Sequence, residues 1–278
     1  MGRIGTGWQL TKVSFGVIRK DKELLLFPFL ALIVSGLMWG LFLASIFILD
    51  IAFIEQIQEQ SVYLYYALYF LFYFLTAFIA IYFQAAVVGS AMIRLEGGSP
   101  TIGDAFRQAN KHVGKLFKWA LLTATVGLIL RAIARRGGFI GRIIAGALGI
   151  TWTLASYMAI PVVVAEGLGP WAALKRSASL FRKTWGETLV GGLGMGVILV
   201  LLAFLGIIPL IAGVYLVTNV SLLVGLVVIA VAVIYWFIIF LVWGAAWPIL
   251  SAVLYRYAAQ GKVAPGVPED LIRTSIQV

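Results

Sequence analysis

Four arginines in one short stretch are the residues of this chain best suited to bind an anion. A guanidinium carries a planar fork of donors that matches phosphate and carboxylate oxygens. Arg131 and Arg135 are four residues apart, which places them on one face of a helix. The sequence therefore predicts an anion or lipid-headgroup site formed by Arg131, Arg135, Arg136 and Arg142. The alternative is that these side chains extend to headgroups without selectivity, or pair with Glu55 and Glu59.

A second basic cluster follows a turn that contains glycine and proline. The segment from Glu166 reads EGLGPWAALKRSASLFRK, in which a carboxylate and a proline precede a helix with basic and apolar faces. Such a helix can lie in the headgroup layer with its charges facing anionic lipid. The predicted headgroup ligands of this segment are Lys175, Arg176, Arg182 and Lys183.

The same turn occurs earlier in the chain. Glu96-Gly97-x-x-Pro100 recurs as Glu166-Gly167-x-x-Pro170 at an offset of 70. A proline suits the first turn of a helix, where its missing N–H costs nothing. We predict that Glu96, Pro100, Glu166 and Pro170 are elbow or gate residues, and the alternative for each carboxylate is a salt bridge or a helix cap.

The sequence offers little else for catalysis or metal binding. It contains no cysteine and a single histidine, His112, which we expect to be solvated in a polar segment. No nucleophile elbow, phosphate loop, metal-ligand spacing or carboxylate pair is found. We therefore predict that the protein is not an enzyme, with no catalytic residue, no metal site and no cofactor.

Composition indicates that these residues are positioned by membrane-spanning helices. Hydrophobic residues make up 62% of the chain and charged residues 12%, against about 25% charged in a soluble domain. Several apolar runs exceed the roughly 18 residues that a helix needs to cross the hydrocarbon core. We predict six spans, at residues 24–49, 62–93, 116–130, 143–165, 189–217 and 222–254.

The distribution of lysine and arginine predicts the orientation of these spans. With both termini in the cytoplasm, only the four arginines between the third and fourth runs lie outside. If the short third run were instead re-entrant, every later segment would invert and seven basic residues would face outward. Six spans is the better interpretation, and the second and sixth are long enough to tilt or to project from the bilayer.

The interior of the spans contains no charged residue in a central position, which disfavours ion-coupled transport. Gln84, in the second span, is the one polar side chain that we single out as an intramembrane candidate. Proline can kink or break spans four, five and six, at Pro161, Pro209 and Pro248. Pairs of glycines four apart permit close helix approach within one chain or in a homo-oligomer; they are Gly36/Gly40, Gly137/Gly141 and Gly192/Gly196.

The repeated turn extends to a threefold internal repeat. The N-terminal segment matches the one after Glu166 at an offset of 164, pairing Leu10 with Leu174 and Glu23 with Glu187. The fold class that follows is an all-α integral membrane protein of six transmembrane helices, built as three copies of an amphipathic elbow helix plus a two-span hairpin. We predict one transmembrane domain over residues 1–278, with units at about 1–95, 96–165 and 166–260 and a cytoplasmic tail at 261–278.

The two elbow segments, EGLGPWAALKRSASLFRKTWGE and GWQLTKVSFGVIRKDKELLLFP, resemble a family of uncharacterised six-span prokaryotic membrane proteins. A more distant similarity is to the membrane domain fused to some glycerophosphodiester phosphodiesterases, whose catalytic barrel this chain lacks. The resemblance implies the plasma membrane of a prokaryote and assigns no activity.

Two functions are compatible with this sequence. The first is uncoupled transport or permeation of a small or lipid-like solute through the repeat interface. The second is a membrane scaffold or assembly subunit that binds anionic lipids or a cytoplasmic partner. The expected partners are anionic membrane lipids and a second copy of the chain, and nucleic acid is not expected despite the net charge of +10.

Overall fold

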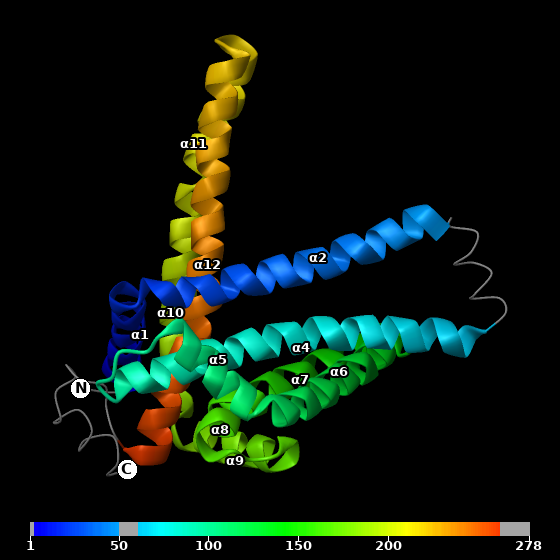
Figure 1. Cartoon of the computed structure of the whole chain (residues 1–278), viewed down its shortest axis with the longest axis vertical. Helices are drawn as coiled ribbons and strands as arrows, with labels where there is room; N and C mark the ends of the chain where they lie inside the picture. The colour runs from blue at the N-terminus through cyan, green and yellow to red at the C-terminus, as the bar shows by residue number, and fades with distance from the viewer. Residues whose placement is uncertain (1–2, 50–60, 262–278) are drawn as a thin grey trace. The chain divides into compact units, whose positions relative to one another are not determined.

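The computed structural model describes residues 3–49 and 61–261, and throughout these ranges the ordered structure is helical (Figure 1). Six of the described segments are long and apolar enough to cross a membrane, which confirms the predicted number of spans. The third, α6 (Val113–Arg136), is a single helix of 24 residues. At about 1.5 Å per residue it exceeds the roughly 30 Å of hydrocarbon, which favours a full span over a re-entrant segment.

The chain divides into two compact units. The first comprises Met1–Leu26, Ala91–Ser99 and Lys183–Val278, and the second comprises Phe27–Ser90 and Pro100–Arg182. Each unit therefore collects segments that are distant in sequence. This division into two units does not test the threefold repeat, which remains a prediction from the sequence.

In the first unit, the amphipathic α1 (Arg3–Lys20) packs against α10 (Trp185–Leu205) and α12 (Leu222–Gln260). Leu10 and Thr11 are buried, and the Thr11 hydroxyl donates to the Gly191 carbonyl at 3.0 Å. Gly194 admits the Trp8 ring, since a Cβ at Gly194 would lie 3.2 Å from it. The apolar face of α1 is thus covered by protein. A short 3-10 turn, η1 (Lys22–Leu25), follows α1 and contacts α12.

Span five breaks at Gly206, between α10 and α11 (Ile207–Asn219). Pro209 lacks the N–H of a regular helix, and the Gly206 N–H turns to the Ala203 carbonyl at 3.1 Å. The Leu202 carbonyl, which that N–H would otherwise bond, accepts from the Tyr235 hydroxyl at 2.6 Å. The Trp236 Nε1–H donates to the Ala203 carbonyl at 2.8 Å. Span six thus satisfies the backbone groups that the break in span five releases.

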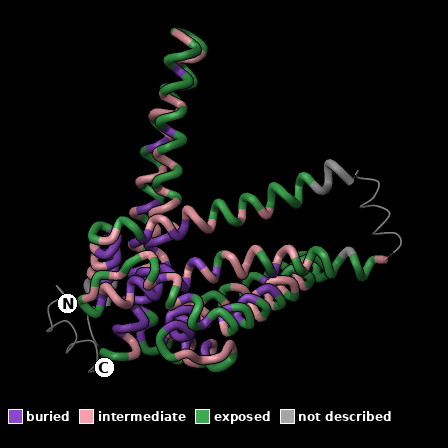
Figure 2. Tube along the Cα trace, viewed as in Figure 1, coloured by how far each residue is buried: buried purple, intermediate pink, exposed green. Residues whose placement is uncertain are grey.

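Helices α11 and α12 form an antiparallel hairpin in which most residues from 207 to 244 are exposed or half-buried (Figure 2). Such exposed apolar surface is typical of lipid-facing helices. Pro248 lies within α12 and does not end it, and the Ser251 hydroxyl donates to the Pro248 carbonyl at 2.7 Å.

The second unit contains nearly all of α2 (Leu26–Leu49), the part of α4 (Val62–Leu95) up to Ser90, and five further helices. Phe72 of α4 stacks on Phe42 of α2 with ring centroids 4.3 Å apart. The inner end of α4 is buried from Ala85 to Ser90. The remaining helices are α5 (Ile102–Lys111), α6, α7 (Gly138–Ser156), α8 (Ala159–Glu166) and α9 (Pro170–Lys183).

The α6–α7 hairpin uses one of the predicted glycine pairs within the chain. A Cβ at Gly137 would lie 2.5 Å from the Gly141 Cα, and one at Gly141 would lie 2.5 Å from the Ile133 carbonyl oxygen. A Cβ at Gly192 would lie 3.5 Å from the Trp247 ring, whereas a Cβ at Gly36, Gly40 or Gly196 would meet nothing within 4 Å. A role for Gly36 and Gly40 in association between copies remains a prediction.

Candidate functional site

The elbow after span four is held by polar contacts from three helices of the second unit. Helix α8 ends at Glu166, and Gly167 follows with φ of +63°, a left-handed conformation that favours glycine. The Lys115 ammonium of α6 donates to the Gly167 carbonyl. The Arg176 guanidinium of α9 donates to Glu166 at 3.0 Å. The alternative reading of Glu166 as a salt-bridge residue is therefore the one that the structure supports.

His112 lies at the corner between α5 and α6, beside the same elbow. Its side chain is 8% exposed, so the prediction of a solvated histidine is wrong. A Cβ at Gly167 would lie 3.5 Å from the imidazole Cε1. The polar sequence around His112 concealed this burial, because the elbow that covers it is more than fifty residues away.

The electrostatics of this corner keep His112 neutral. Burial, and then the positive charges of Lys115 and Lys111, lower the pKa of His112 below its ordinary value of 6.5, while the Val164 backbone carbonyl acts in the opposite direction. The neutral imidazole is therefore the favoured form of His112 beside the positively charged Lys115, which bonds the Gly167 carbonyl.

The protein is accordingly expected to lose stability on mild acidification. Because the folded pKa of His112 is depressed, the unfolded chain binds more protons below pH 6.5, so stability is fully present above that pH and falls as the pH drops. The slope from one proton is at most about 1.4 kcal/mol per pH unit. Apparent melting temperatures in detergent at pH 7.5 and 5.5 should differ more for the natural protein than for His112→Asn. Equal differences would contradict the burial of His112.

Helix α9 presents two distinct faces. Ala173, Ser177 and Leu180 are fully buried. The predicted headgroup ligands Lys175, Arg182 and Lys183 are exposed, together with Trp171 at 65%. The fourth predicted ligand, Arg176, is engaged by Glu166. Protein, not lipid, thus covers the apolar stripe of α9, and its basic side chains are free to meet a partner.

Ser177 links α9 to the break in span four. Helix α7 ends at Ser156 and α8 begins at Ala159, before Pro161, and in this break the Met158 N–H donates to the Ser177 hydroxyl at 3.0 Å. Both residues are fully buried.

Ser177→Ala should therefore destabilise the protein by about 1 to 3 kcal/mol, the cost of an unsatisfied buried donor. Denaturant titration in detergent micelles measures this change. Ser179→Ala, at an exposed position of the same helix, is the matched control and should be neutral. Equal effects of the two substitutions would exclude the hydrogen bond as the cause.

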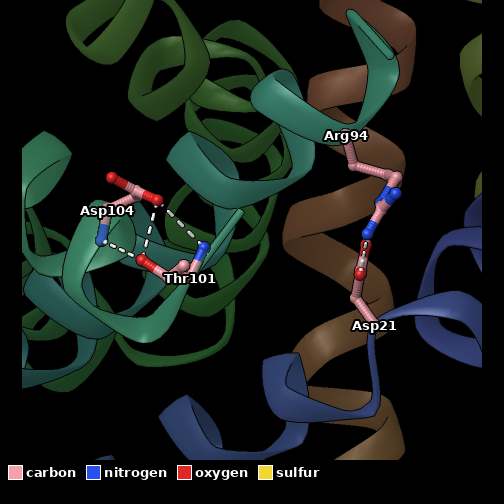
Figure 3. Close-up of polar contacts among 4 residues, drawn as sticks. All are labelled: Asp21, Arg94, Thr101 and Asp104. Carbon is pink, nitrogen blue, oxygen red and sulfur yellow. Dashed lines mark hydrogen bonds and ion pairs between the residues drawn. The ribbon is translucent and has the colours of Figure 1, made fainter. Parts of the chain in front are cut away.

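The first elbow starts its helix differently. Pro170 is the first residue of α9, as predicted, but Pro100 precedes the N-cap of α5 and lies outside that helix. Thr101 and Asp104 form a capping box (Figure 3), which sets the start at Ile102. These hydrogen bonds lower the pKa of Asp104. At an offset of 70 stand Trp171 and Leu174, which cannot cap a helix in this way.

The two elbow glutamates also differ. Glu96 is exposed and forms no ion pair within the described part of the chain. The position that matches Arg176 at an offset of 70 is Phe106, which packs on Phe27 with ring centroids 5.5 Å apart. The Glu166–Arg176 pair therefore has no counterpart at Glu96, although the turn sequence is shared.

The four predicted arginines gather at the tip of the α6–α7 hairpin and are all exposed. Arg131 is held by α4, because its guanidinium donates to the Tyr69 hydroxyl at 3.1 Å and lies 4.6 Å from the centre of the Tyr73 ring. Arg142 donates to the Gly138 carbonyl at 3.4 Å. Phe139 and Ile140 at the tip are 72% and 69% exposed. The alternative partners Glu55 and Glu59 lie outside the described residues.

The first unit contains an ion pair that the sequence did not predict. Arg94, at the end of α4, donates through Nε and Nη2 to the two carboxylate oxygens of Asp21, in the turn after α1 (Figure 3). The Asp21 side chain is 10% exposed and that of Arg94 is 23% exposed. Both oxygens of this partly buried carboxylate are thereby used.

Arg256 is the second charged residue that sequence reasoning missed. It lies in α12 within a stretch, from Ser251 to Tyr257, whose side chains are all buried. Arg256 is 9% exposed, and its Nη1 has no hydrogen-bond partner. The carbonyl end of a helix stabilises a cation by up to about 2 kcal/mol. That is less than the several kcal/mol that burial of an unpaired ion costs, so α12 alone does not compensate the charge.

Gln84 is half-buried on α4. Its role as an intramembrane site residue remains a prediction.

A family model covers most of these features. The model of a family of unknown function, DUF6159, matches residues 63–265, well over half of the chain. The chain belongs to this family. The matched DUF6159 region begins in α4 and includes the α6–α7 tip, the α8–α9 elbow and Arg256, and it leaves out α1 and α2. No curated protein matches the chain.

Proposed function

We propose that this DUF6159 protein is a non-enzymatic membrane scaffold that holds anionic lipids at the exposed basic face of α9. The observation that carries this proposal is that α9 has one buried and one exposed face. Ala173, Ser177 and Leu180 are buried. Lys175, Arg182 and Lys183 are exposed. The helix follows the end of a span, where headgroups lie. Trp171, 65% exposed, has the amphipathic ring that favours this interfacial depth.

The arginines at the α6–α7 tip supply a second surface of the same chemistry. Arg131 is positioned by Tyr69 and Tyr73, and the exposed Phe139 and Ile140 offer apolar contact to acyl chains. Basic and apolar side chains together suit the headgroup boundary. In the proposed topology, with both termini cytoplasmic, the tip faces outward and α9 faces the cytoplasm of a prokaryotic cell. The threefold repeat and a homo-oligomer through the open Gly36/Gly40 face belong to the same proposal.

The test is lipid retention by the purified protein. Native mass spectrometry would compare bound phosphatidylglycerol and phosphatidylcholine for the natural protein and for the Lys175→Gln/Arg182→Gln/Lys183→Gln variant. At about 1 kcal/mol per basic residue, the variant should lose phosphatidylglycerol affinity by one to two orders of magnitude. The charge-preserving Lys175→Arg/Arg182→Lys/Lys183→Arg variant is the matched control and should retain it. Equal retention by both variants would end the scaffold proposal for α9.

Uncoupled permeation of a small or lipid-like solute is the second candidate, favoured by the breaks in spans four and five. Interrupted helices are typical of the spans that line transporter cavities. Here the interruptions lie at Met158 and Gly206. Proteoliposomes with a fluorescent lipid in the inner leaflet would test lipid movement. A rate equal to that of protein-free vesicles, for lipid and for a panel of small solutes, would remove this candidate.

A further inference from the structure

We propose that the first unit binds a phosphate group at Arg256, the buried guanidinium of α12 whose Nη1 has no partner. Arg256 is not among the residues of the basic surfaces of α9 and the α6–α7 tip, so substitutions can test this proposal independently of the scaffold proposal. The ligand class is a phosphate monoester or diester, carried by a lipid headgroup or by a soluble molecule.

The charge of Arg256 requires a counter-anion. Unlike lysine or histidine, arginine does not lose its proton in a protein, so burial cannot neutralise it. The side chain is nevertheless 9% exposed, and Nη1 has no hydrogen-bond partner. Buried charges in folded proteins are paired or hydrogen-bonded.

The first unit does not provide that anion from the side chains described. The partly buried carboxylate of Asp21 bonds Arg94 through both oxygens. Glu23 and Glu96 are exposed. Arg256 also forms no ion pair with any side chain in the described ranges. The compensating anion must therefore come from outside these side chains.

The position of Arg256 in α12 selects phosphate. The helix has 39 residues, or about 58 Å, nearly twice the thickness of the hydrocarbon core. Arg256 lies one turn before the helix ends at Gln260, which places it at headgroup depth or beyond when the apolar part of α12 crosses the membrane. Phosphate is the abundant anion of that layer, and its oxygens match the guanidinium fork.

The experiment is a ligand-dependent thermal shift on the full chain in a neutral detergent. The probes are short-chain phosphatidylglycerol, diacylglycerol of the same chain length, and inorganic phosphate. At a concentration about 100 times its dissociation constant, a phosphate-bearing ligand should raise the apparent melting temperature by about 5 °C or more. Diacylglycerol should not. A shift with phosphatidylglycerol alone assigns the lipid headgroup, a shift with inorganic phosphate assigns a soluble source, and no shift with either overturns the proposal.

Variants then locate the site. Arg256→Gln should abolish the shift, whereas Lys175→Gln/Arg182→Gln/Lys183→Gln should keep it; the reverse result would support the scaffold surface and overturn this site. If Arg256→Gln does not fold, Arg256→Lys serves instead. It retains the charge without the fork and should bind at least about tenfold more weakly, and undiminished binding overturns the proposal.

Two further variants test an internal ligand. Glu269 and Asp270 lie outside the described residues and follow α12 in the sequence, and the side chain of Glu187 is likewise not among those described. Glu187→Gln and Glu269→Gln/Asp270→Asn should both keep the shift. If either changes it as much as Arg256→Gln does, the partner of Arg256 is a carboxylate of the chain itself, and the phosphate site is excluded.

Discussion

Asp21→Asn is expected to lower the free energy of unfolding by about 3 kcal/mol. Removal of one partner from a buried ion pair leaves the other charge uncompensated, which typically costs about 3 to 5 kcal/mol. The Asp21–Arg94 pair is only partly buried, with side chains 10% and 23% exposed, so the loss is expected at the lower end of that range. The introduced amide could still accept one hydrogen bond but could not balance the guanidinium, which now bonds both carboxylate oxygens (Figure 3). Denaturant titration in detergent micelles measures the loss.

The double variant Asp21→Leu/Arg94→Met separates charge from packing. Apolar side chains of similar size often replace a buried ion pair without loss. The double variant should therefore be more stable than Asp21→Asn, although it carries more substitutions. If it is less stable than the single variant, the pair stabilises the fold through its own hydrogen bonds, and the argument from an orphaned charge is wrong.

The spans could be predicted because hydropathy is a local property. Five of the six predicted runs are apolar over the roughly 18 residues or more that a helix needs to cross a bilayer, and no distant residue changes that requirement; only the run at 116–130 is shorter. The breaks in spans four and five could also be predicted from the sequence, because Pro161 and Pro209 lie near them. The sequence did not indicate how the breaks are satisfied. Ser177, Tyr235 and Trp236 serve that role from other helices.

Polar partners were harder to predict because tertiary contacts choose them. Asp21 and Arg94 are 73 positions apart and belong to no motif. Arg256 lies just beyond residue 254, where the sequence predicted the end of span six, and the structure shows that α12 continues to Gln260. Glu96 and Glu166 share a turn sequence, yet only Glu166 has a basic side chain ten residues later. A repeated motif therefore predicts a repeated backbone more securely than a repeated site.

Gly225→Ala is expected to destabilise the α11–α12 hairpin by about 3 kcal/mol. A Cβ at Gly225 would lie 2.4 Å from the Val217 backbone nitrogen and 2.7 Å from the Gly213 carbonyl oxygen. The opposing Gly213 is also close, since its Cβ would meet the Ile229 nitrogen at 3.0 Å. Backbone atoms cannot turn away as a side chain can, so the two helices must separate and lose contacts along their length.

The sign of this effect is its most informative feature. In an isolated helix, Gly→Ala is favourable by about 1 kcal/mol, because alanine loses less backbone entropy. Gly196→Ala, on α10, where the added Cβ would meet nothing within 4 Å, should show that gain and is the matched control. Opposite signs at the two positions, measured by denaturant titration, would establish that backbone contact between α11 and α12 governs this part of the first unit. A gain in stability from Gly225→Ala would show that α11 and α12 do not pack closely enough at Gly225 to exclude a methyl group.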